Sequence, residues 1–260
     1  MSLVGKTFAS YFKDLFHINN SNSGVDATTR NIKDGLGNST SLSVSDDVLS
    51  VQPVTDNTTG SMLVKNQGGS NILAVDTTNS LVKVGSGQVN ATTQYAYFGI
   101  ESTESTLFIA NTHYTIPFSK NSITTPLSIG TGTNPDATYT ISSTAHDFVN
   151  VFWYVPDAIT IDAVYWWHGA DTATGDTTRA HLMSYAIDSG NSATGGDLSD
   201  GTVVADGGDI TNAGYEQAYY QSMTIQSANV SAGRVIAFTF RSDSISSDYS
   251  ISATIKYHIQ

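Results

Sequence analysis

Apolar and polar residues alternate with a period of two along the C-terminal part of the chain. In residues 249–259 every second side chain is apolar, and the positions between them hold serine, threonine, lysine and histidine. Successive side chains of a β-strand point to opposite faces, so this pattern predicts a strand with one buried and one solvated face. With no helical pattern between them, the apolar runs of this region predict an antiparallel β-sandwich over residues 146–260. The runs are 148–155, 159–171, 179–188, 215–227, 234–243 and 249–260.

A different period appears at the N-terminus. Apolar side chains recur there with the i, i+3, i+4, i+7, i+8 spacing of one helix face, at Phe8, Tyr11, Phe12, Leu15 and Phe16. A polar stretch, residues 19–24, ends the pattern. So short a helix does not persist alone in water. It packs either on its own chain or on neighbouring subunits, and we favour the second because no core is apparent nearby. Residues 1–24 are therefore predicted to be an anchoring helix.

Short β-segments separated by turns fill residues 25–100. The clearest is the hairpin ILAVDTTNSLVKVG, residues 72–85, where Val82 and Val84 point to one side and Leu81 and Lys83 to the other. A two-stranded ribbon is marginal in water unless its apolar face is covered. Copies wound together from several chains share one core, and a homotrimer is the simplest such arrangement. The predicted interface is Leu73, Val75, Val82 and Val84.

The phrases NIKDGLGNSTSLSVSDDVLSV and GSMLVKNQGGSNILAVDTTNSLVKVG, in this order, resemble the N-terminal and shaft regions of bacteriophage tail-fibre and related virion-surface proteins. LAVDTTNSLVKVG is the most specific piece. The resemblance covers about residues 25–100 and implies a trimeric virion component in which β-segments of three chains wrap around a common axis. The chain has only one or two such units, which favours a short projection. By analogy with virion proteins, the sandwich is expected to be a jelly roll.

Composition and charge limit the classes of partner that the chain is expected to bind. The chain has 260 residues, no cysteine and a net charge of −12, with 6 Lys and Arg against 7 Asp and Glu in residues 1–100 and 5 against 16 in the remainder. Such an acidic surface repels phosphate backbones, so nucleic acid is excluded as a partner. Thiolate metal sites and disulfides are excluded too. The start shows no secretory signal, and no apolar run spans a bilayer, so no membrane partner is expected.

Two groups of polar residues have the chemistry of metal ligands. His168, Asp171, Asp176 and His181 offer nitrogen and oxygen donors, but their spacing matches no defined metal motif, and a turn explains them equally well. The segment 188–209 carries Asp197, Asp200, Asp206 and Asp209 among glycines. Calcium binding there stays open, although a solvated surface loop is the favoured interpretation. We therefore expect no metal, no cofactor and no catalytic residues, since no nucleophile or phosphate-binding motif appears either.

Aromatic residues form the last candidate. Trp166 and Trp167 are adjacent in a predicted strand, so they face opposite sides and only one of them fills the core. An exposed aromatic patch suits sugar or protein recognition, and burial between subunits is the equal alternative. The candidate residues for recognition are Trp166, Trp167 and Tyr219.

Together these observations predict a mainly β, trimeric chain. An anchoring helix (1–24) precedes a stem (25–100), a turn-rich transition (101–145) and a jelly-roll sandwich (146–260). The predicted function is a non-enzymatic virion structural protein on the particle surface, bound to capsid or tail proteins through its N-terminus. One alternative is a tail-fibre adhesin that binds a host-surface glycan or protein, and another is an accessory module of a carbohydrate-active enzyme.

Overall fold

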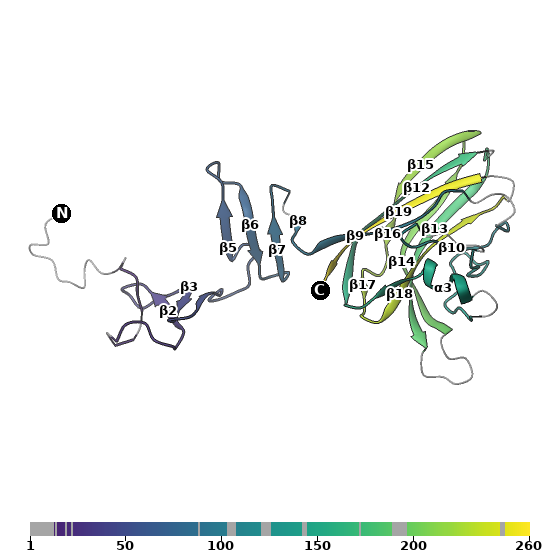
Figure 1. The fold of residues 1–260 in the computed structure, drawn as a ribbon. Coiled ribbons are helices and arrows are strands. Elements are labelled where there is room, and N and C mark those ends of the chain that lie inside the picture. The colour runs from purple at the N-terminus through teal and green to yellow at the C-terminus, as the bar shows by residue number, and fades with distance from the viewer. Residues whose placement is uncertain are drawn as a thin grey trace, which may run out of the picture. The chain divides into compact units, whose positions relative to one another are not determined.

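The computed structural model describes residues 13, 15–18, 20–21, 23–87, 89–102, 108–120, 126–141, 145–171, 173–188, 197–244 and 248–260. Within them the chain is mainly β, and its sheets are antiparallel (Figure 1). It divides into two compact units, residues 1–92 and 93–260. The sequence predicts a stem that ends near residue 100. Residues 93–100 instead form a strand that pairs with the C-terminal strand of the second unit.

The first unit contains two small sheets, each with its strands in chain order. The first is built from β1 (His17–Ile18), β2 (Arg30–Lys33), β3 (Ser39–Val44) and β4 (Leu49–Val51). The second is built from β5 (Met62–Lys65), β6 (Asn71–Asp76), β7 (Leu81–Val84) and β8 (Val89–Asn90). The predicted hairpin is confirmed as β6 and β7, which pair from Leu73↔Val84 to Asp76↔Leu81. Its polar corner closes at Ser80, whose φ of 56° is in the left-handed region.

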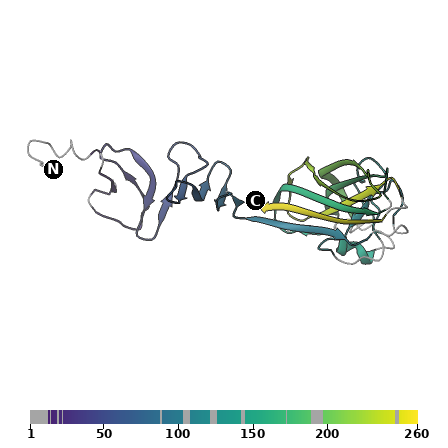
Figure 2. The same ribbon diagram turned by 90° about the horizontal axis from the view of Figure 1, so that it is seen from above.

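The second unit contains two larger sheets. The β12–β19 sheet has the order β15 (Glu216–Ser222), β12 (Ile159–Asp171), β19 (Asp248–Ile259) and β9 (Thr93–Ile100), with β17 (Asn229–Val230) also paired to β12. The β13–β18 sheet has the order β10 (Tyr114–Ile116), β18 (Arg234–Ser242), β13 (Thr177–Asp188), β14 (Asp197–Thr211) and β16 (Thr224–Ile225), with β11 (Trp153–Val155) also paired to β18. Figure 2 shows β9 and β19 side by side along one layer of this unit. This arrangement is consistent with the predicted sandwich.

The main core lies between these two sheets. Alternate side chains of β19 point into it, and so do those of β12 on either side of a bulge between Ile161 and Ala163; Val164, Trp166 and Ile255 are fully buried. The alternation predicted for residues 249–259 is therefore confirmed except at its end, where Ile259 is exposed. Alternation of this kind leaves the β12–β19 sheet with one outer face, on which β19 places serine, threonine, lysine and histidine.

The β13–β18 sheet is covered on both faces. A second cluster packs on its outer side, where α3 (Ala145–Val151) and the segment 126–141 supply Val151, Leu127 and Ile129. Strands buried on both faces carry near-continuous apolar runs, which is why β18 is buried at almost every position. The helix α3 corrects the sequence analysis, which expected a strand from residue 148. That strand begins only at Trp153.

The first unit has almost no core of its own. Among its described apolar side chains, only Ala74 is buried, and every member of both core clusters lies in the second unit. Phe8, Tyr11 and Phe12 of the predicted anchoring helix lie outside the described residues. Leu15 and Phe16 are described, and they are exposed residues outside any helix that directly precede β1. No helix among the described residues has both the length and the apolar character to cross a membrane.

Candidate functional site

The β5–β8 sheet exposes one uniformly apolar face. The register places Val75 between Met62 and Val82, and Leu73 between Val64 and Val84. Neighbours in register share a face, so these side chains form a continuous surface. We call this surface the stem face; its members are Met62, Val64, Leu73, Val75, Val82, Val84 and Val89.

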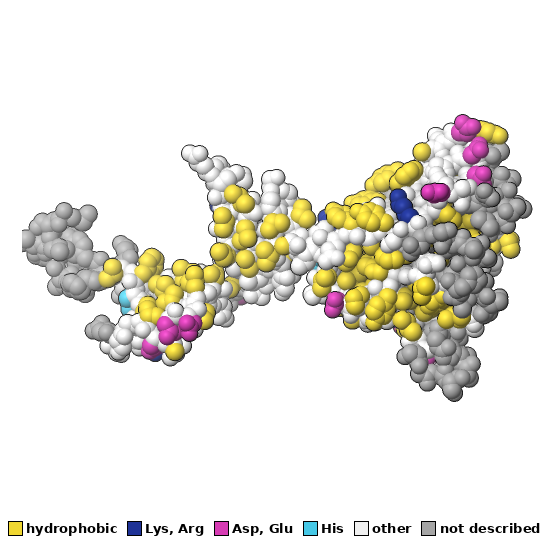
Figure 3. Space-filling model, in the orientation of Figure 1, with side chains coloured by type: hydrophobic (Ala, Val, Ile, Leu, Met, Phe, Trp, Pro, Cys, Tyr) yellow, Lys and Arg dark blue, Asp and Glu magenta, His cyan; other side chains and the backbone are white. Residues whose placement is uncertain are grey.

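The stem face is partly exposed, and no described residue of the first unit covers it. Val82 is 40% exposed and Met62 is 45% exposed, although both are apolar residues of a sheet. The space-filling view shows yellow side chains gathered over these strands (Figure 3). Contiguous apolar surfaces are uncommon on soluble monomers unless they bind something. The four residues predicted from the hairpin therefore lie together on one exposed face, and whether other copies cover it is the subject of the proposal below.

The other face of the same sheet is organised around an ion pair. Lys83 Nζ lies 2.7 Å from Asp76 Oδ2, and Asn79 donates to Asp76 from both its backbone and its side-chain nitrogen. The hydrogen bond from Lys83, followed by that from the Asn79 side chain, lowers the pKa of Asp76 to about 2. Because Asp76 is buried and paired, this face holds the hairpin corner in place. Lys83 is therefore a structural residue, so a substitution of Lys83 cannot serve as a control for a substitution of Val82.

Adjacent aromatic residues of the second unit face opposite ways, as the sequence predicted. Trp166 is fully buried and donates to Gln221 Oε1 at 2.9 Å, whereas Trp167 is 51% exposed. Trp166 is therefore excluded from a surface site. Tyr219 is excluded as well, because it is paired with His168 and stacks on that inward ring at 5.3 Å. Its neighbour Tyr220, which the prediction omitted, is 65% exposed.

An aromatic surface covers the outer side of the β12–β19 sheet. Tyr220 lies opposite Trp167, and the Tyr165 and Tyr220 rings are 6.2 Å apart and nearly parallel, with an interplanar angle of 17°. Tyr97 and Tyr95 of β9 lie on the same side, on the other edge of β19. We call this surface the aromatic face; its aromatic members are Tyr95, Tyr97, Tyr165, Trp167 and Tyr220.

Short side chains separate the two groups of rings. The register runs from Trp167 to Ser252 and from Tyr165 through Thr254 to Tyr97, so hydroxyls of β19 lie between the aromatic columns. Ser250 follows opposite Gly169, where an added Cβ would approach Ser250 Oγ to 2.9 Å. Small residues of β19 therefore separate the two aromatic columns.

A shallow hollow of about 550 Å³ lies at the end of the sheet where β15 and β19 begin. Gly169, Ala218 and Ser250 belong to its lining, and four carboxylates form its rim: Glu101, Asp171, Glu216 and Asp248. Acidic side chains gather at this end of the unit in Figure 3. Hydrogen-bond acceptors thus lie next to the aromatic surface.

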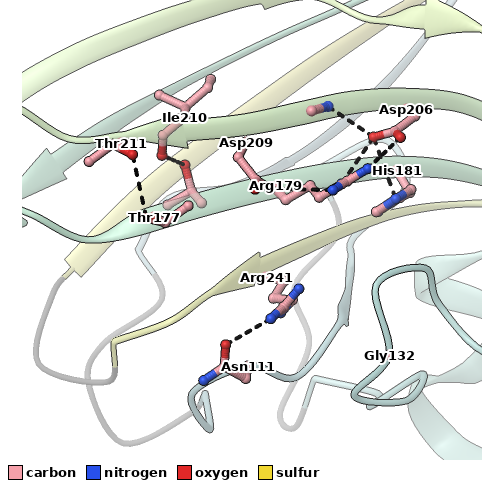
Figure 4. Close-up of polar contacts among 12 residues, drawn as sticks. Asn111, Gly132, Thr177, Arg179, His181, Asp206, Asp209, Ile210, Thr211 and Arg241 are labelled. Carbon is pink, nitrogen blue, oxygen red and sulfur yellow. Dashed lines mark hydrogen bonds and ion pairs between the residues drawn. The ribbon is translucent and has the colours of Figure 1, made fainter.

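A buried polar cluster lies on the outer side of the β13–β18 sheet (Figure 4). The rings of His113 and His181 meet edge to face at 5.1 Å, and both side chains are fully buried. His113 Nε2 lies 3.0 Å from the Gly132 carbonyl oxygen. Neither ring nitrogen of His181 has a hydrogen-bond partner among the described residues, and its Nε2 is 3.5 Å from Asp206.

Near His181, the positive charge of Arg179 is paired with carboxylates of the neighbouring strand β14. Arg179 binds Asp206 through two nitrogens, at 2.5 and 3.1 Å, and reaches Asp209 at 3.4 Å. Burial lowers the pKa of His181 to about 4, and Asp206 offsets this only in part. Burial likewise lowers the pKa of His113. Both rings are therefore neutral at pH 7, as core residues are.

The polar residues considered as metal ligands do not converge. His168 lies inside the sandwich, stacked on Trp166 at 4.9 Å, and connects through Asn212 and Tyr249 to Asp176. His181 lies on the outer side of the other sheet. Among the described residues, no group of three or more His, Asp or Glu side chains is placed to hold a metal ion.

In the aspartate-rich segment 188–209, the described residues, 188 and 197–209, are strand, which corrects the surface-loop interpretation for them. Residues from Asp197 onward belong to β14, and Asp206 and Asp209 pair with Arg179. Asp200 contacts Arg234 at 3.2 Å. These carboxylates are therefore engaged by arginines along strands. The sequence concealed this because glycine and aspartate disfavour strands, and only pairing with β13 overrides that preference.

Comparison with known proteins adds little to this geometry. No protein-family model matches the chain, and no curated protein matches it. One solved structure with some likeness is the CBM22-1-GH10 modules of Clostridium thermocellum endo-1,4-beta-D-xylanase 10B, complexed with xylohexaose. The identity is 16%, the match covers 42% of this chain and 18% of that chain, and the TM-score is 0.21. At that TM-score the likeness carries no argument about fold or function.

Proposed function

We propose that this protein is a non-enzymatic structural component of a bacteriophage virion, a short surface projection made of three copies. In the proposed trimer the copies bury their stem faces against one another. The virion setting and the number of copies come from the resemblance of residues 25–100 to tail-fibre shafts. The anchoring helix and the jelly-roll connection of the sandwich belong to the same proposal.

One observation carries the proposal: the first unit has an ordered sheet whose apolar face no described residue of that unit covers. A small sheet is stable only when its apolar face is buried. Completing the burial of a valine or leucine is worth about 1 kcal/mol for a side chain that is already half buried. Association costs translational and rotational freedom. Burial of the seven side chains of the stem face offsets this free-energy cost only if most of them are covered.

A second copy of the chain suits this surface better than an unrelated charged partner. The stem face is aliphatic, and residues 1–100 hold 6 basic against 7 acidic side chains, so like units approach without strong repulsion. The excess of acidic over basic side chains lies in residues 101–260. Self-association through the stem face is therefore chemically consistent with both its composition and its charge.

The test is the oligomeric state of the full chain. Light scattering at micromolar concentration should give a trimer, and Val82→Asp should dissociate it at least tenfold more readily by placing a carboxylate in the shared core. The matched control is Ile72→Asp, which adds the same charge to a 50% exposed position on the opposite face. A monomeric full-length protein, or equal effects of the two variants, would contradict the proposal.

Membership of the virion is tested separately. Mass spectrometry of purified particles should find the chain at a copy number divisible by three, and particle imaging should place it at the surface. A trimer that is absent from particles would remove the virion role while leaving the stem interface intact.

A further inference from the structure

We propose that the aromatic face of the β12–β19 sheet is a binding site for a neutral polysaccharide chain. Such a site does not depend on the trimer, because every residue in it belongs to the second unit. It rests on the order of side chains across four neighbouring strands, which the register fixes.

The shape of the aromatic face suits a linear chain of sugar rings. Trp167 and Tyr165 on β12 and Tyr97 on β9 are separated by β19, so the two aromatic columns lie about 10 Å apart, twice the strand spacing. Between them the floor consists of Ser252 and Thr254. A single extended polymer fits between the columns and continues into the hollow beside Gly169.

The chemistry of the face suits sugars as well. The C–H faces of pyranose rings are apolar and stack on aromatic rings, whereas their edges carry hydroxyl groups. The nearly parallel Tyr165 and Tyr220 rings offer such a platform, with Trp167 beside them. Serine and threonine hydroxyls on β19 and the rim carboxylates supply acceptors for sugar hydroxyls. Apolar stacking and directional polar contacts are thus available within one surface.

The charge of the surroundings selects the class of polymer. Glu101, Asp171, Glu216 and Asp248 surround the hollow, so a uronic, sulfated or phosphate polymer would meet like charge there. Two lysines lie on this side, Lys256 beside Tyr95 and Lys120, whose side chain lies against Gly99 of β9, and they do not offset four carboxylates. A second copy of this chain would bring the same acidic rim into the contact, which disfavours self-association through this face. An uncharged polysaccharide meets none of these penalties.

The experiment is a binding assay of the full chain against a glycan array of neutral, amino and anionic oligosaccharides, followed by calorimetry with each neutral hit. We expect at least one neutral oligosaccharide of four or more residues to bind. Trp167→Ala and Tyr220→Ala should each weaken that binding at least tenfold. Tyr154→Ala is the matched control, because Tyr154 is 56% exposed on β11 of the other sheet and should leave affinity unchanged.

Each remaining outcome is decisive. Binding restricted to anionic glycans, binding that survives Trp167→Ala together with Tyr220→Ala, or no binding to any neutral glycan would overturn the proposal. A circular dichroism spectrum identical to that of the unmodified chain shows that the variants are folded. Because both substituted side chains are exposed, misfolding is not expected to obscure the result.

Discussion

At the scale of single residues, the least usual feature is a pair of buried histidines. His113 and His181 are neutral in the folded protein because burial disfavours their charged forms. Arg179 and Arg241 add positive charge nearby, whereas Asp206 attracts the proton but is itself held by Arg179. In the unfolded chain histidine takes up a proton near its ordinary pKa of about 6.5.

Stability should therefore fall as the pH drops from about 6.5 towards 4. Over this range the unfolded state binds protons that His181 in the folded state does not, so the free energy of unfolding decreases. From the lowered pKa of His181, the loss between pH 8 and pH 5 is about 2 kcal/mol. Urea denaturation at the two pH values measures it. His181→Gln should reduce the difference, and His17→Gln in β1 should not; an unchanged difference in His181→Gln would refute the assignment.

At the scale of elements, β12 shows how a strand separates two roles. Trp166 and Trp167 are identical side chains one residue apart, one fully buried and the other 51% exposed. Trp166 fills the space against Phe238 and Phe240, whereas Trp167 contributes to the aromatic face. The same substitution therefore tests core packing at Trp166 and the chemistry of the aromatic face at Trp167.

Trp166→Ala should lower the free energy of unfolding by about 3–5 kcal/mol, because it leaves a cavity between the sheets and removes the partner of Gln221. Trp167→Ala should change it by less than about 1 kcal/mol. Chemical denaturation followed by circular dichroism gives both values. Similar costs at both positions would mean that Trp167 is covered in solution.

Sequence patterns predicted those features that depend on one strand, and missed those that depend on its neighbours. Alternation alone predicted the opposite orientations of Trp166 and Trp167 and the shared side of Val82 and Val84. It could not predict that Tyr220, instead of Tyr219, lies beside Trp167, because only the pairing register decides that. The aromatic face was therefore only partly recognisable.

The helix α3 and the buried histidines were missed for a related reason. Residues 145–151 lead into an apolar run, and such a short run is compatible with a strand or a buried helix. Residues 126–141 contain few regular patterns, yet they cover the outer side of the β13–β18 sheet. His113 meets His181 only because that covering segment and β10 are placed there.

At the scale of the whole molecule, the two units differ in where their stability originates. All residues of both core clusters belong to residues 93–260, so this unit carries its own core. The sandwich therefore does not require neighbouring copies in order to bury its apolar side chains. The first unit, with Ala74 as the one buried apolar side chain among its described residues, has no comparable internal support.

A fragment of residues 93–260 should therefore fold cooperatively and remain monomeric, with a thermal midpoint that is independent of concentration. The full chain should show a second transition whose midpoint rises with protein concentration, because the proposed trimer would cover the stem face only when the copies associate. Differential scanning calorimetry over a hundredfold range of concentration distinguishes the two. A single concentration-independent transition of the full chain would show that the first unit is stable alone.

The scarcity of buried side chains in the first unit also has a kinetic consequence. The sandwich acquires its core within one molecule, so its formation follows a first-order rate law. In the proposed trimer, the β5–β8 sheet is completed only when chains collide, and its rate then depends on a higher power of the chain concentration. At low chain concentration the sandwich would fold before the stem assembles. Dilution alone would lengthen the time between these two steps, although every contact stays the same.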